Sequence, residues 1–543
     1  MSVLLRRSNA VPVTSQYRFW LAVTGTSPLV NLDLKLPNLE ERLEDAFIEE
    51  QKTWWQLGNA LSKDTNGALA HMPTAGSFGS DFGIMLAWGR LVKELAYEKN
   101  VILVVCDDPW LFHHLAEIEG VESGVKPALI WKTLYYNLRG FFVRARIALR
   151  NALAALTLSS SRKIFASGET ALLVYGHPSS NINGYDAYFG DLMARCRSLK
   201  RLLHTDCLVK RASELAKDSR TMSLHAWGNP WFALSLLLCR WRPPEHYLSG
   251  PNGWLIKRAA IIENSGGGPA MNFWQAHCQE QWLNIARPSC IVWPWENHGW
   301  ERNLCRVASR LNIKTIGYQH TVIGPHQFNY AIYSNHDGLK SIPDVVVADG
   351  PAYLNEMVAW GIPESRLVIG GAFRFPRFSD DLYDLNGPVF VPLSAVFEVA
   401  FSQLEIARVL ASKGQRVLVK PHPMYPVSFD ESDNLVCAKL PLAEQRGLSA
   451  VLYSTGASGL EAILMGIPGY RLTLDDRIAI DVLPRGITTL SVTIKNAAAA
   501  ILEVRASHSI VLWEEIFSDP DIELWKSLLF SDIDSPNKIH MEN

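Results

Sequence analysis

The sequence has no paired cysteines and no long uncharged apolar run. Its eight cysteines stand singly along 543 residues, without the CxxC spacing that zinc sites and dithiol redox motifs use. No run of about 18 uncharged apolar residues occurs, and Arg6 and Arg7 are not followed by the apolar segment of a signal peptide. These absences predict reduced and mostly buried thiols, no membrane-spanning helix and a cytoplasmic location.

The net charge is also close to zero. A formal charge of -2 gives no general attraction to nucleic acid, and no RNA- or DNA-binding motif is present, so we expect no nucleic-acid partner. Hydrophobic residues make up 48% and charged residues 20% of the chain, which excludes a disordered or fibrous protein. The length exceeds what one hydrophobic core supports and predicts two or three domains.

Acidic residues are missing from residues 123–168, whereas basic residues alternate there with aromatic and aliphatic ones. A basic, aromatic helix of this kind can lie on anionic lipid, which predicts peripheral contact with the cytoplasmic face of the inner membrane through residues 126–163. An ordinary surface helix whose long basic side chains cover a neighbouring domain is the alternative. The basic residues are Lys126, Lys132, Arg139, Arg144, Arg146, Arg150, Arg162 and Lys163.

Short apolar runs that are typical of strands recur along the chain, separated by helical patterns. In the first half they lie at residues 18–23, 101–106, 171–175 and 223–227. The most regular unit is a strand at 290–294, a helix with one apolar face and a strand at 314–318. Strands that alternate with helices predict an α/β fold with parallel sheets.

Further strands are predicted at 344–348, 366–369, 389–392, 416–420 and 450–453. A stretch rich in proline and aspartate, 375–388, separates the last three from the others. We therefore predict an N-terminal domain over 1–345, a C-terminal domain over 346–530 and a tail over 531–543.

The segment Lys420-Pro421-His422-Pro423 directly follows an apolar run. His422 is therefore expected at the carboxyl edge of a parallel sheet, where open α/β sheets bind ligands. Prolines on both sides restrict the loop and can aim the imidazole at a phosphate. A plain turn with a surface histidine is the alternative.

A second segment, Ser454-Thr455-Gly456-Ala457-Ser458-Gly459, follows the predicted strand 450–453 and opens a short helix. Small hydroxyl and glycine residues let backbone N–H groups approach an anion, and the positive end of a helix favours phosphate. Glu461, one turn into the helix, can accept hydrogen bonds from ribose hydroxyls. Alternatively, Ser454 or Ser458 simply caps the helix.

In their order and spacing, these two segments resemble the HP and S-S/T motifs of bacterial sialyltransferases, polysialyltransferases and capsule Kdo transferases. The stretches Trp-Glu-Asn-His-Gly-Trp-Glu at 295–301 and Gly-Tyr-Gln-His-Thr at 317–321 also resemble bacterial surface-carbohydrate biosynthesis proteins. The resemblance covers roughly residues 285–475, and the first 280 residues match no family that we can name.

The resemblance implies a GT-B glycosyltransferase, an α/β protein with two Rossmann-like domains facing a central cleft. The C-terminal domain would hold a nucleotide sugar, and the N-terminal domain a glycan or lipid-linked glycan that becomes capsule, O-antigen or another surface polysaccharide. The donor implied is a CMP-activated acidic sugar, Kdo or a sialic-acid-like sugar, with His422, Ser454 and Thr455 on its CMP part. The expected donor site also includes Lys420, Pro423, Gly456, Ser458 and Glu461.

No cofactor besides the nucleotide sugar is expected, and no metal ion. Adjacent aspartates occur at 107–108 and 475–476, but neither pair forms a DxD-like motif at a strand end. The dipole of the helix and His422 can stabilise the leaving phosphate instead.

The acidic-acidic-glycine motif that supplies the base in sialyltransferases has no copy in this sequence. Glu296 is the first candidate for the catalytic base, because it follows the strand 290–294 and so lies at the edge expected to face the cleft. Three nearby tryptophans, at 293, 295 and 300, can stack on sugar rings or can belong to the core. Glu301 and His320 are further candidates, and Glu301 can instead cap its own helix.

A loop in the first half, with His177 and Asp186, is a possible acceptor contact, and Asp186 is a further rival for the base. Other functions stay open: a UDP-sugar transferase or UDP-sugar 2-epimerase, a CDP-polyol phosphotransferase, and a non-catalytic subunit of glycan assembly that has lost the base. Nucleotide preference and turnover separate them.

Overall fold

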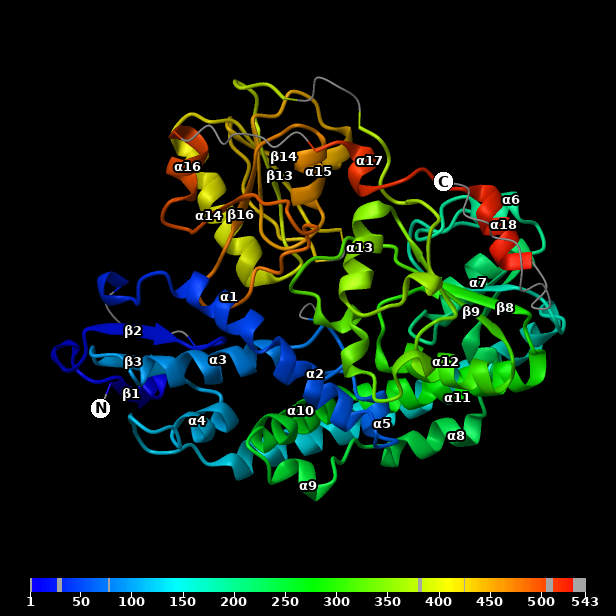
Figure 1. Ribbon diagram of the computed structural model, residues 1–543, viewed down its shortest axis with the longest axis horizontal. Coiled ribbons are helices and arrows are strands. Elements are labelled where there is room, and N and C mark those ends of the chain that lie inside the picture. Colours follow the sequence, from blue (N-terminus) through cyan, green and yellow to red (C-terminus); the bar gives the residue numbers. More distant parts are fainter. Residues whose placement is uncertain are drawn as a thin grey trace.

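The computed structural model describes residues 2–26, 32–76, 79–378, 383–423, 425–503 and 511–530. It contains sheets of four, seven and six strands, and the strands within each sheet pair in parallel. In Figure 1 the four-stranded sheet lies at the lower left, the seven-stranded sheet at the right and the six-stranded sheet at the top. The predicted α/β class with parallel sheets is confirmed.

The four-stranded sheet, with its helices, is formed by the first part of the chain. Its order is β2 (Phe19–Ala22), β3 (Ile102–Val105), β1 (Val3–Arg6) and β4 (Val121–Ser123). Its helices are α1 (Leu39–Glu49), α2 (Gln51–Leu61), α3 (Phe82–Leu95) and α4 (Pro109–Leu115). Every side chain of β3 is buried, as expected for an apolar parallel strand that is covered on both faces.

The seven-stranded sheet takes up the middle of the chain. Its order is β11 (Leu367–Ile369), β10 (Val345–Ala348), β9 (Lys314–Tyr318), β8 (Cys290–Pro294), β5 (Ala171–Val174), β6 (Lys200–Leu203) and β7 (Thr221–Ser223). The expected boundary between residues 345 and 346 falls inside this sheet, because β10 and β11 continue it as far as Ile369.

The strand expected over 223–227 is wrong beyond its first residue. The strand β7 ends at Ser223, and Leu224–Trp227 forms a 3-10 helix. The Ser223 side chain accepts a hydrogen bond from the His225 N–H at 3.3 Å, which turns the chain out of the extended conformation.

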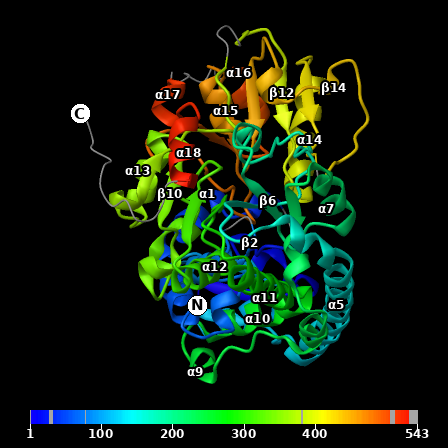
Figure 2. The same ribbon diagram turned by 90° about the vertical axis from the view of Figure 1, so that its right-hand side faces the viewer.

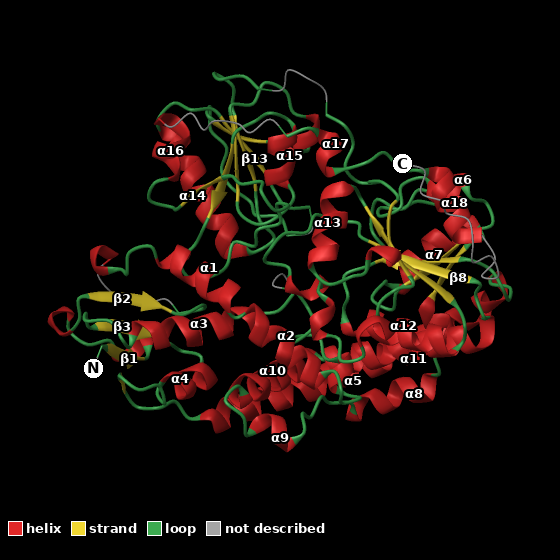
Figure 3. Cartoon of the chain, viewed as in Figure 1, coloured by secondary structure: helices red, strands yellow, loops and turns green. Residues whose placement is uncertain are grey.

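Long helices cover the seven-stranded sheet and connect it to the four-stranded one, along the bottom of Figure 3. They are α5 (Leu129–Leu158), α10 (Gly253–Gly266), α11 (Gly268–Ala286) and α12 (Gly299–Arg310). Shorter helices are α6 (Leu192–Arg195), α7 (Val209–Leu215), α8 (Pro230–Ser235), α9 (Glu245–Leu248) and α13 (Pro351–Ala359). Among the helices of the described residues, none combines the length and apolarity that crossing a bilayer needs.

The six-stranded sheet forms a separate domain. Its order is β14 (Leu435–Cys437), β13 (Val417–Lys420), β12 (Val389–Pro392), β15 (Ala450–Tyr453), β16 (Gly469–Leu472) and β17 (Leu490–Val492). Its helices are α14 (Phe397–Ser412), α15 (Ser458–Leu464) and α16 (Ala497–Glu503). A buried cluster that runs from Val389 to Ala498 gives this domain its own core.

After α16 the chain returns to the seven-stranded sheet through α17 (Trp513–Ile516) and α18 (Ile522–Phe530). The indole of Trp525 is fully buried, lies 5.4 Å from the ring of Tyr318 and donates to the Gly370 carbonyl at 3.0 Å. The expected tail, residues 531–543, lies outside the described residues.

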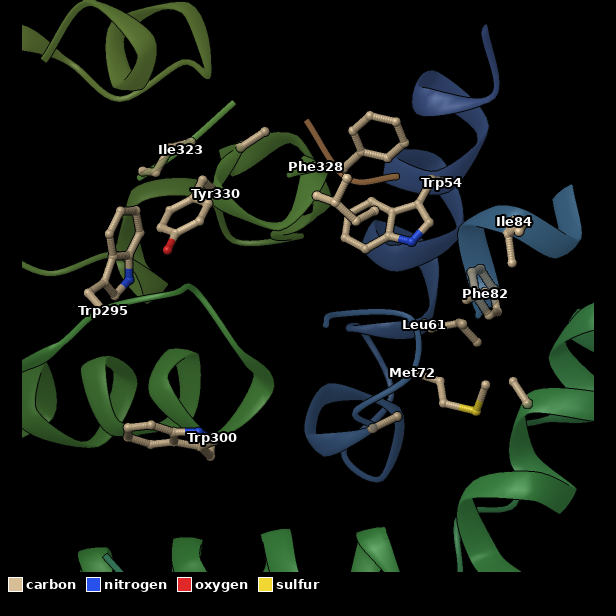
Figure 4. Packing of buried hydrophobic residues seen from close by; sticks show 14 of the residues in the cluster. Trp54, Leu61, Met72, Phe82, Ile84, Trp295, Trp300, Ile323, Phe328 and Tyr330 are labelled. Atoms are coloured by element: carbon tan, nitrogen blue, oxygen red, sulfur yellow. The ribbon is translucent and has the colours of Figure 1, made fainter. Parts of the chain in front are cut away.

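The four-stranded and seven-stranded sheets share one continuous core. In Figure 4, Trp54 of α2 lies beside Phe328, and Trp295, after β8, faces Tyr330. The ring centroids are 6.1 Å apart in the first pair and 5.6 Å in the second. These two sheets therefore form one N-terminal body, on which the six-stranded domain sits. All eight cysteines are free thiols and six of them are buried, as predicted.

Candidate active site

A cavity of about 760 Å³, the main cavity below, lies between the six-stranded domain and the four-stranded unit. The six-stranded domain contributes the loops that follow β12, β13 and β15, which meet at one edge because the strands are parallel. The opposite wall consists of Thr24 after β2, Phe47 of α1, residues 79–81 and Ile84 of α3. This volume is typical of a site for a small ligand, roughly 300 to 1,000 Å³.

Most of the residues expected to bind the donor line the main cavity. The lining includes Lys420, His422, Pro423, Thr455, Gly456 and Ser458. Ser454 and Glu461 do not line it. The wall that faces them belongs to the four-stranded unit, which the sequence did not distinguish from the rest of the first 345 residues.

Ser454 and Thr455 hold neighbouring backbone in place. The Ser454 hydroxyl is buried and donates to the Leu472 carbonyl at 2.8 Å, and the Thr455 hydroxyl accepts from the Ile480 N–H at 3.1 Å. Neither Ser454 nor Ser458 caps α15, whose N-cap residue is Ala457. The helix has seven residues, so any anion affinity here comes from the cavity wall as a whole more than from a helix dipole.

The side chains of His422 and Lys420 differ in their contacts. His422 is half-buried and stacks on Tyr425, with ring centroids 5.6 Å apart. Burial lowers the pKa of His422 below its usual 6.5, so the neutral ring is the main form at pH 7. The Lys420 ammonium donates to the carbonyls of Ala438 and Lys439 at 3.3 and 2.7 Å. Arg477 also lines the cavity, and its guanidinium donates to the Asp476 carboxylate at 3.1 and 3.0 Å.

A second group of polar side chains lies at the carboxyl edge of the seven-stranded sheet. The two Glu296 oxygens lie 3.5 Å from His298 Nε2 and 3.6 Å from His320 Nε2. Burial lowers the pKa of His298 to about 4 and that of His320 to about 3, so both rings are neutral at pH 7. Burial raises the pKa of Glu296, and the nearby Arg374 opposes that shift. The sequence predicted Glu296 and His320 separately, each after a strand, and the structure brings the two side chains together.

Glu301 has a structural task. Its side chain is buried, and its carboxylate accepts from the His298 N–H at 2.8 Å and the Glu296 N–H at 3.1 Å. This capping box fixes the start of α12 and the loop that carries Glu296. Of the two interpretations that the sequence left open for Glu301, the contacts favour the cap.

The three tryptophans beside Glu296 belong to the core. Trp293 and Trp295 are fully buried and Trp300 is 8% exposed, and Figure 4 shows Trp295 and Trp300 within the buried cluster. The idea that they stack on sugar rings is therefore wrong. Asp186 is likewise buried, where it pairs with Arg201 at 3.7 Å and accepts from the Ser180 hydroxyl. Only His177 of that loop lies near the edge, with its ring 6.1 Å from Tyr188.

Arg374 is a candidate functional residue that the sequence analysis missed. It follows β11, is exposed, lies over the Tyr188 ring at 5.6 Å and donates to the His320 carbonyl at 3.4 Å. Its charge opposes the raised pKa of both Glu296 in the N-terminal body and Glu461 in the six-stranded domain. One cation thus acts on carboxyls from both sides, and no sequence motif marks it.

His71 connects the two groups. Gly79, which lines the main cavity, also lies against His71, and the His71 ring is 5.7 Å from that of His298. A smaller cavity of about 470 Å³ opens here, lined by His71, Glu263 and Asn272, and it shares residues 79–81 with the main cavity. The two cavities therefore share residues 79–81 as a common wall, and His71 lies between this wall and the Glu296 group.

The chain has distant likenesses to solved structures. The chain is similar to the glycosyltransferase of kitacinnamycin (12% identity, 67% of this chain and 99% of that one, TM-score 0.41). It is also similar to CalG4, the calicheamicin glycosyltransferase (13%, 63% and 91%, 0.39), and to the UDP-GlcNAc 2-epimerase of Methanocaldococcus jannaschii (10%, 66% and 99%, 0.37). No protein-family model and no curated protein matches the chain. Similarity at this level identifies no function.

Proposed function

We propose that the chain is a GT-B glycosyltransferase that binds a nucleotide-sugar donor in the main cavity and uses Glu296 as the base for an acceptor hydroxyl. The observation that carries the proposal is the neighbourhood of a ligand-sized cavity and a second, carboxylate-bearing group, with Gly79 and His71 between them. A transfer reaction needs these two parts side by side, one for the leaving nucleotide and one for the incoming nucleophile.

The proposed reaction forms one bond and breaks another. The acceptor oxygen attacks the anomeric carbon of the donor sugar, the bond from that carbon to the phosphate oxygen breaks, and the nucleotide leaves with the electron pair. Glu296 takes the acceptor proton. The raised pKa of its carboxyl, caused by burial, brings it closer to neutral pH and makes it a better proton acceptor. His298 and His320 lie beside the carboxylate and, being neutral, leave its charge uncompensated.

The nucleotide site draws support from the groups on the cavity wall. A neutral His422 can donate one hydrogen bond to a phosphate. Gly456 has a φ of 131°, a backbone conformation that side chains rarely adopt, so the loop after β15 needs a glycine at the cavity wall. We propose that the acceptor binds in the smaller cavity, because His71 lines this cavity and lies next to His298 of the Glu296 group.

The finer proposal is a CMP-activated acidic sugar, Kdo or a sialic-acid-like sugar, as donor for a surface glycan. It rests on the motif resemblance of His422, Ser454 and Thr455. In the fold, Thr455 and His422 line the main cavity while Ser454 supports it from behind, which fits a role of this motif in shaping the nucleotide site.

A thermal-shift titration with CMP, CDP, UDP, GDP and ADP tests both the proposed nucleotide site and the proposed CMP-linked donor. A ligand at about 100 times its Kd adds roughly 2.7 kcal/mol of stability. A shift with CMP alone supports the acidic-sugar donor, whereas a shift with UDP replaces it by a UDP-sugar transferase or 2-epimerase, and one with CDP by a polyol-phosphate transferase.

The site itself is tested with His422→Ala. Loss of one hydrogen bond to the nucleotide should weaken binding about tenfold. His246→Ala, at an exposed histidine of α9, is the matched control and should bind as the unchanged protein does. Equal binding by both variants, or no shift with any nucleotide, contradicts the proposed site.

A further inference from the structure

The helix α5 turns an apolar face outward, which is the reverse of the pattern expected in a soluble domain. Large side chains spaced three to seven residues apart are exposed along it: Trp131, Leu134, Leu138, Phe142, Leu149 and Leu153. Trp131 is 73% and Phe142 64% exposed. Figure 2 places α5 at the lower right edge of the molecule, with α10 and α11 on its inner side.

The opposite, inner face of α5 already packs against the rest of the protein. Gly140, Arg144, Ala148, Ala152 and Ala155 are buried there. A Cβ on Gly140 would come within 2.5 Å of the Asn264 carbonyl, so α5 packs tightly on α10. The helix has a well-packed side already, and its apolar outer stripe has no neighbour within the described residues.

Some basic residues of this segment pack on the protein, as in an ordinary surface helix, and others are free to contact a membrane. Arg144 donates to the Leu237 carbonyl at 3.0 Å and Arg150 to the Thr205 carbonyl at 3.2 Å, so these two pack on the protein. Lys132, Arg139 and Arg146 are exposed beside the apolar stripe. Their charge is available to a partner on the outside.

The neighbouring segment extends the same surface. The helix α8 packs against α5, and Trp231 and Leu238 on this segment are 79% and 80% exposed. Residues 219–244, like residues 123–168, contain no aspartate or glutamate. Exposed aromatic and aliphatic groups among cations, without any carboxylate from these two segments, match the interface of an anionic bilayer, where indole rings are favoured and the headgroups are negative.

We infer that the outer face of α5, together with α8, is a docking surface for the headgroup region of an anionic lipid bilayer. The helix lies in the plane of the interface, with Trp131 and Phe142 among the acyl chains and Lys132, Arg139 and Arg146 at the phosphates. A protein partner would need carboxylates opposite these cations, and a second copy of the same face would bring like charges together. The inference does not depend on which nucleotide the main cavity binds.

Co-sedimentation of the full chain with vesicles tests it. The protein should pellet with vesicles of phosphatidylcholine containing phosphatidylglycerol and stay in solution with phosphatidylcholine alone. High salt should release it, because the Debye length falls to about 3 Å at 1 M salt. Arg139→Gln with Arg146→Gln should lower the partition coefficient about fivefold for each charge removed.

The apolar contribution is tested with Trp131→Ser combined with Phe142→Ser, which should lose at least about tenfold in partitioning. Phe401→Ser is the matched control, because Phe401 is 56% exposed on α14 in the other domain. Thermal unfolding of each variant checks that the fold is kept.

Three outcomes overturn the inference. The unchanged protein fails to pellet with the anionic vesicles, or the Trp131/Phe142 variant pellets as well as Phe401→Ser does. The third is that sedimentation velocity finds a dimer that the Trp131/Phe142 variant dissociates while its lipid binding is unchanged, in which case a second copy covers this face.

Discussion

At the scale of single residues, Glu296 and Glu301 show how the surroundings assign different tasks to the same functional group. The Glu301 carboxylate is enclosed by the backbone N–H groups of Glu296 and His298. The Glu296 side chain is 35% exposed and faces two neutral imidazoles. A carboxylate without backbone donors of its own is the one left available for a proton.

Glu296→Gln should therefore remove turnover and keep the donor. Loss of a general base typically lowers kcat about 10² to 10⁴-fold, whereas the nucleotide should still shift the unfolding temperature as in the unchanged protein. Single-turnover kinetics with the donor identified by titration measures the first effect. Glu444→Gln, at an exposed carboxylate, is the control, and unchanged kcat in Glu296→Gln removes this residue as the base.

Glu263 gives a prediction about pH. Burial raises the pKa of its carboxyl from 4.5 to about 7, although it accepts from the N–H groups of His71 and Met72 at 2.8 and 3.1 Å. The folded state holds this proton more tightly than the unfolded state, so its stabilising effect is complete below pH 4.5 and is lost as the pH rises through about 7. Each pKa unit corresponds to about 1.4 kcal/mol.

Glu263→Gln should flatten the fall in stability between pH 5 and pH 8. Apparent unfolding temperatures of the two proteins at both pH values measure the difference. A parallel fall in the variant would show that other groups cause the pH dependence.

At the scale of elements, the cap on α12 can be separated from catalysis. Glu301→Gln keeps an acceptor for the capping box, whereas Glu301→Ala leaves two N–H groups without that acceptor and should cost about 1 to 3 kcal/mol. We expect Glu301→Gln to retain turnover and Glu301→Ala to lower the unfolding temperature. If the glutamine variant loses activity while its stability is normal, Glu301 has a chemical role.

Local sequence patterns were sufficient for the strands that carry the candidate site. The runs at 290–294, 314–318, 389–392 and 450–453 became β8, β9, β12 and β15 with the same bounds, because buried parallel strands are continuous apolar runs. Edge strands such as β14 and β17 have exposed or half-buried residues and gave no such signal. Arg374 could not be predicted, because its charge acts on Glu296 and Glu461, which are far from it in the sequence.

At the scale of the whole molecule, the number of sheets was beyond the reach of sequence patterns. The strand β5 pairs with β8 across more than a hundred residues, and nothing in the sequence shows that β4 ends one sheet and β5 starts another. As a consequence, the wall of the main cavity that faces the six-stranded domain belongs to the four-stranded unit, which the sequence did not predict. The six-stranded domain has a core of its own, whereas α15 and residues 480–483 of the same domain pack into the core of the N-terminal body.

Several polar contacts join the N-terminal body and the six-stranded domain, and one of them allows a test of the arrangement. Arg471 donates to Glu44 of α1 at 2.7 Å and to the Ala479 carbonyl at 2.8 Å, next to residues that line the main cavity. Because the pair is largely buried, Glu44→Met should destabilise the protein by about 3 to 5 kcal/mol and weaken nucleotide binding. Glu44→Met combined with Arg471→Met should recover part of the stability, and a double variant less stable than Glu44→Met would contradict a direct pairing.

The return of the chain through α17 and α18 has a mechanical consequence. The six-stranded domain is attached to the N-terminal body at two places, after β11 on the way out and before α17 on the way back. Both ends of the six-stranded domain are thereby anchored in the seven-stranded sheet, at β11 and at α18. An insertion that is anchored at both ends stays beside the body that carries it, so the two walls of the main cavity cannot drift apart as two domains on a single linker can.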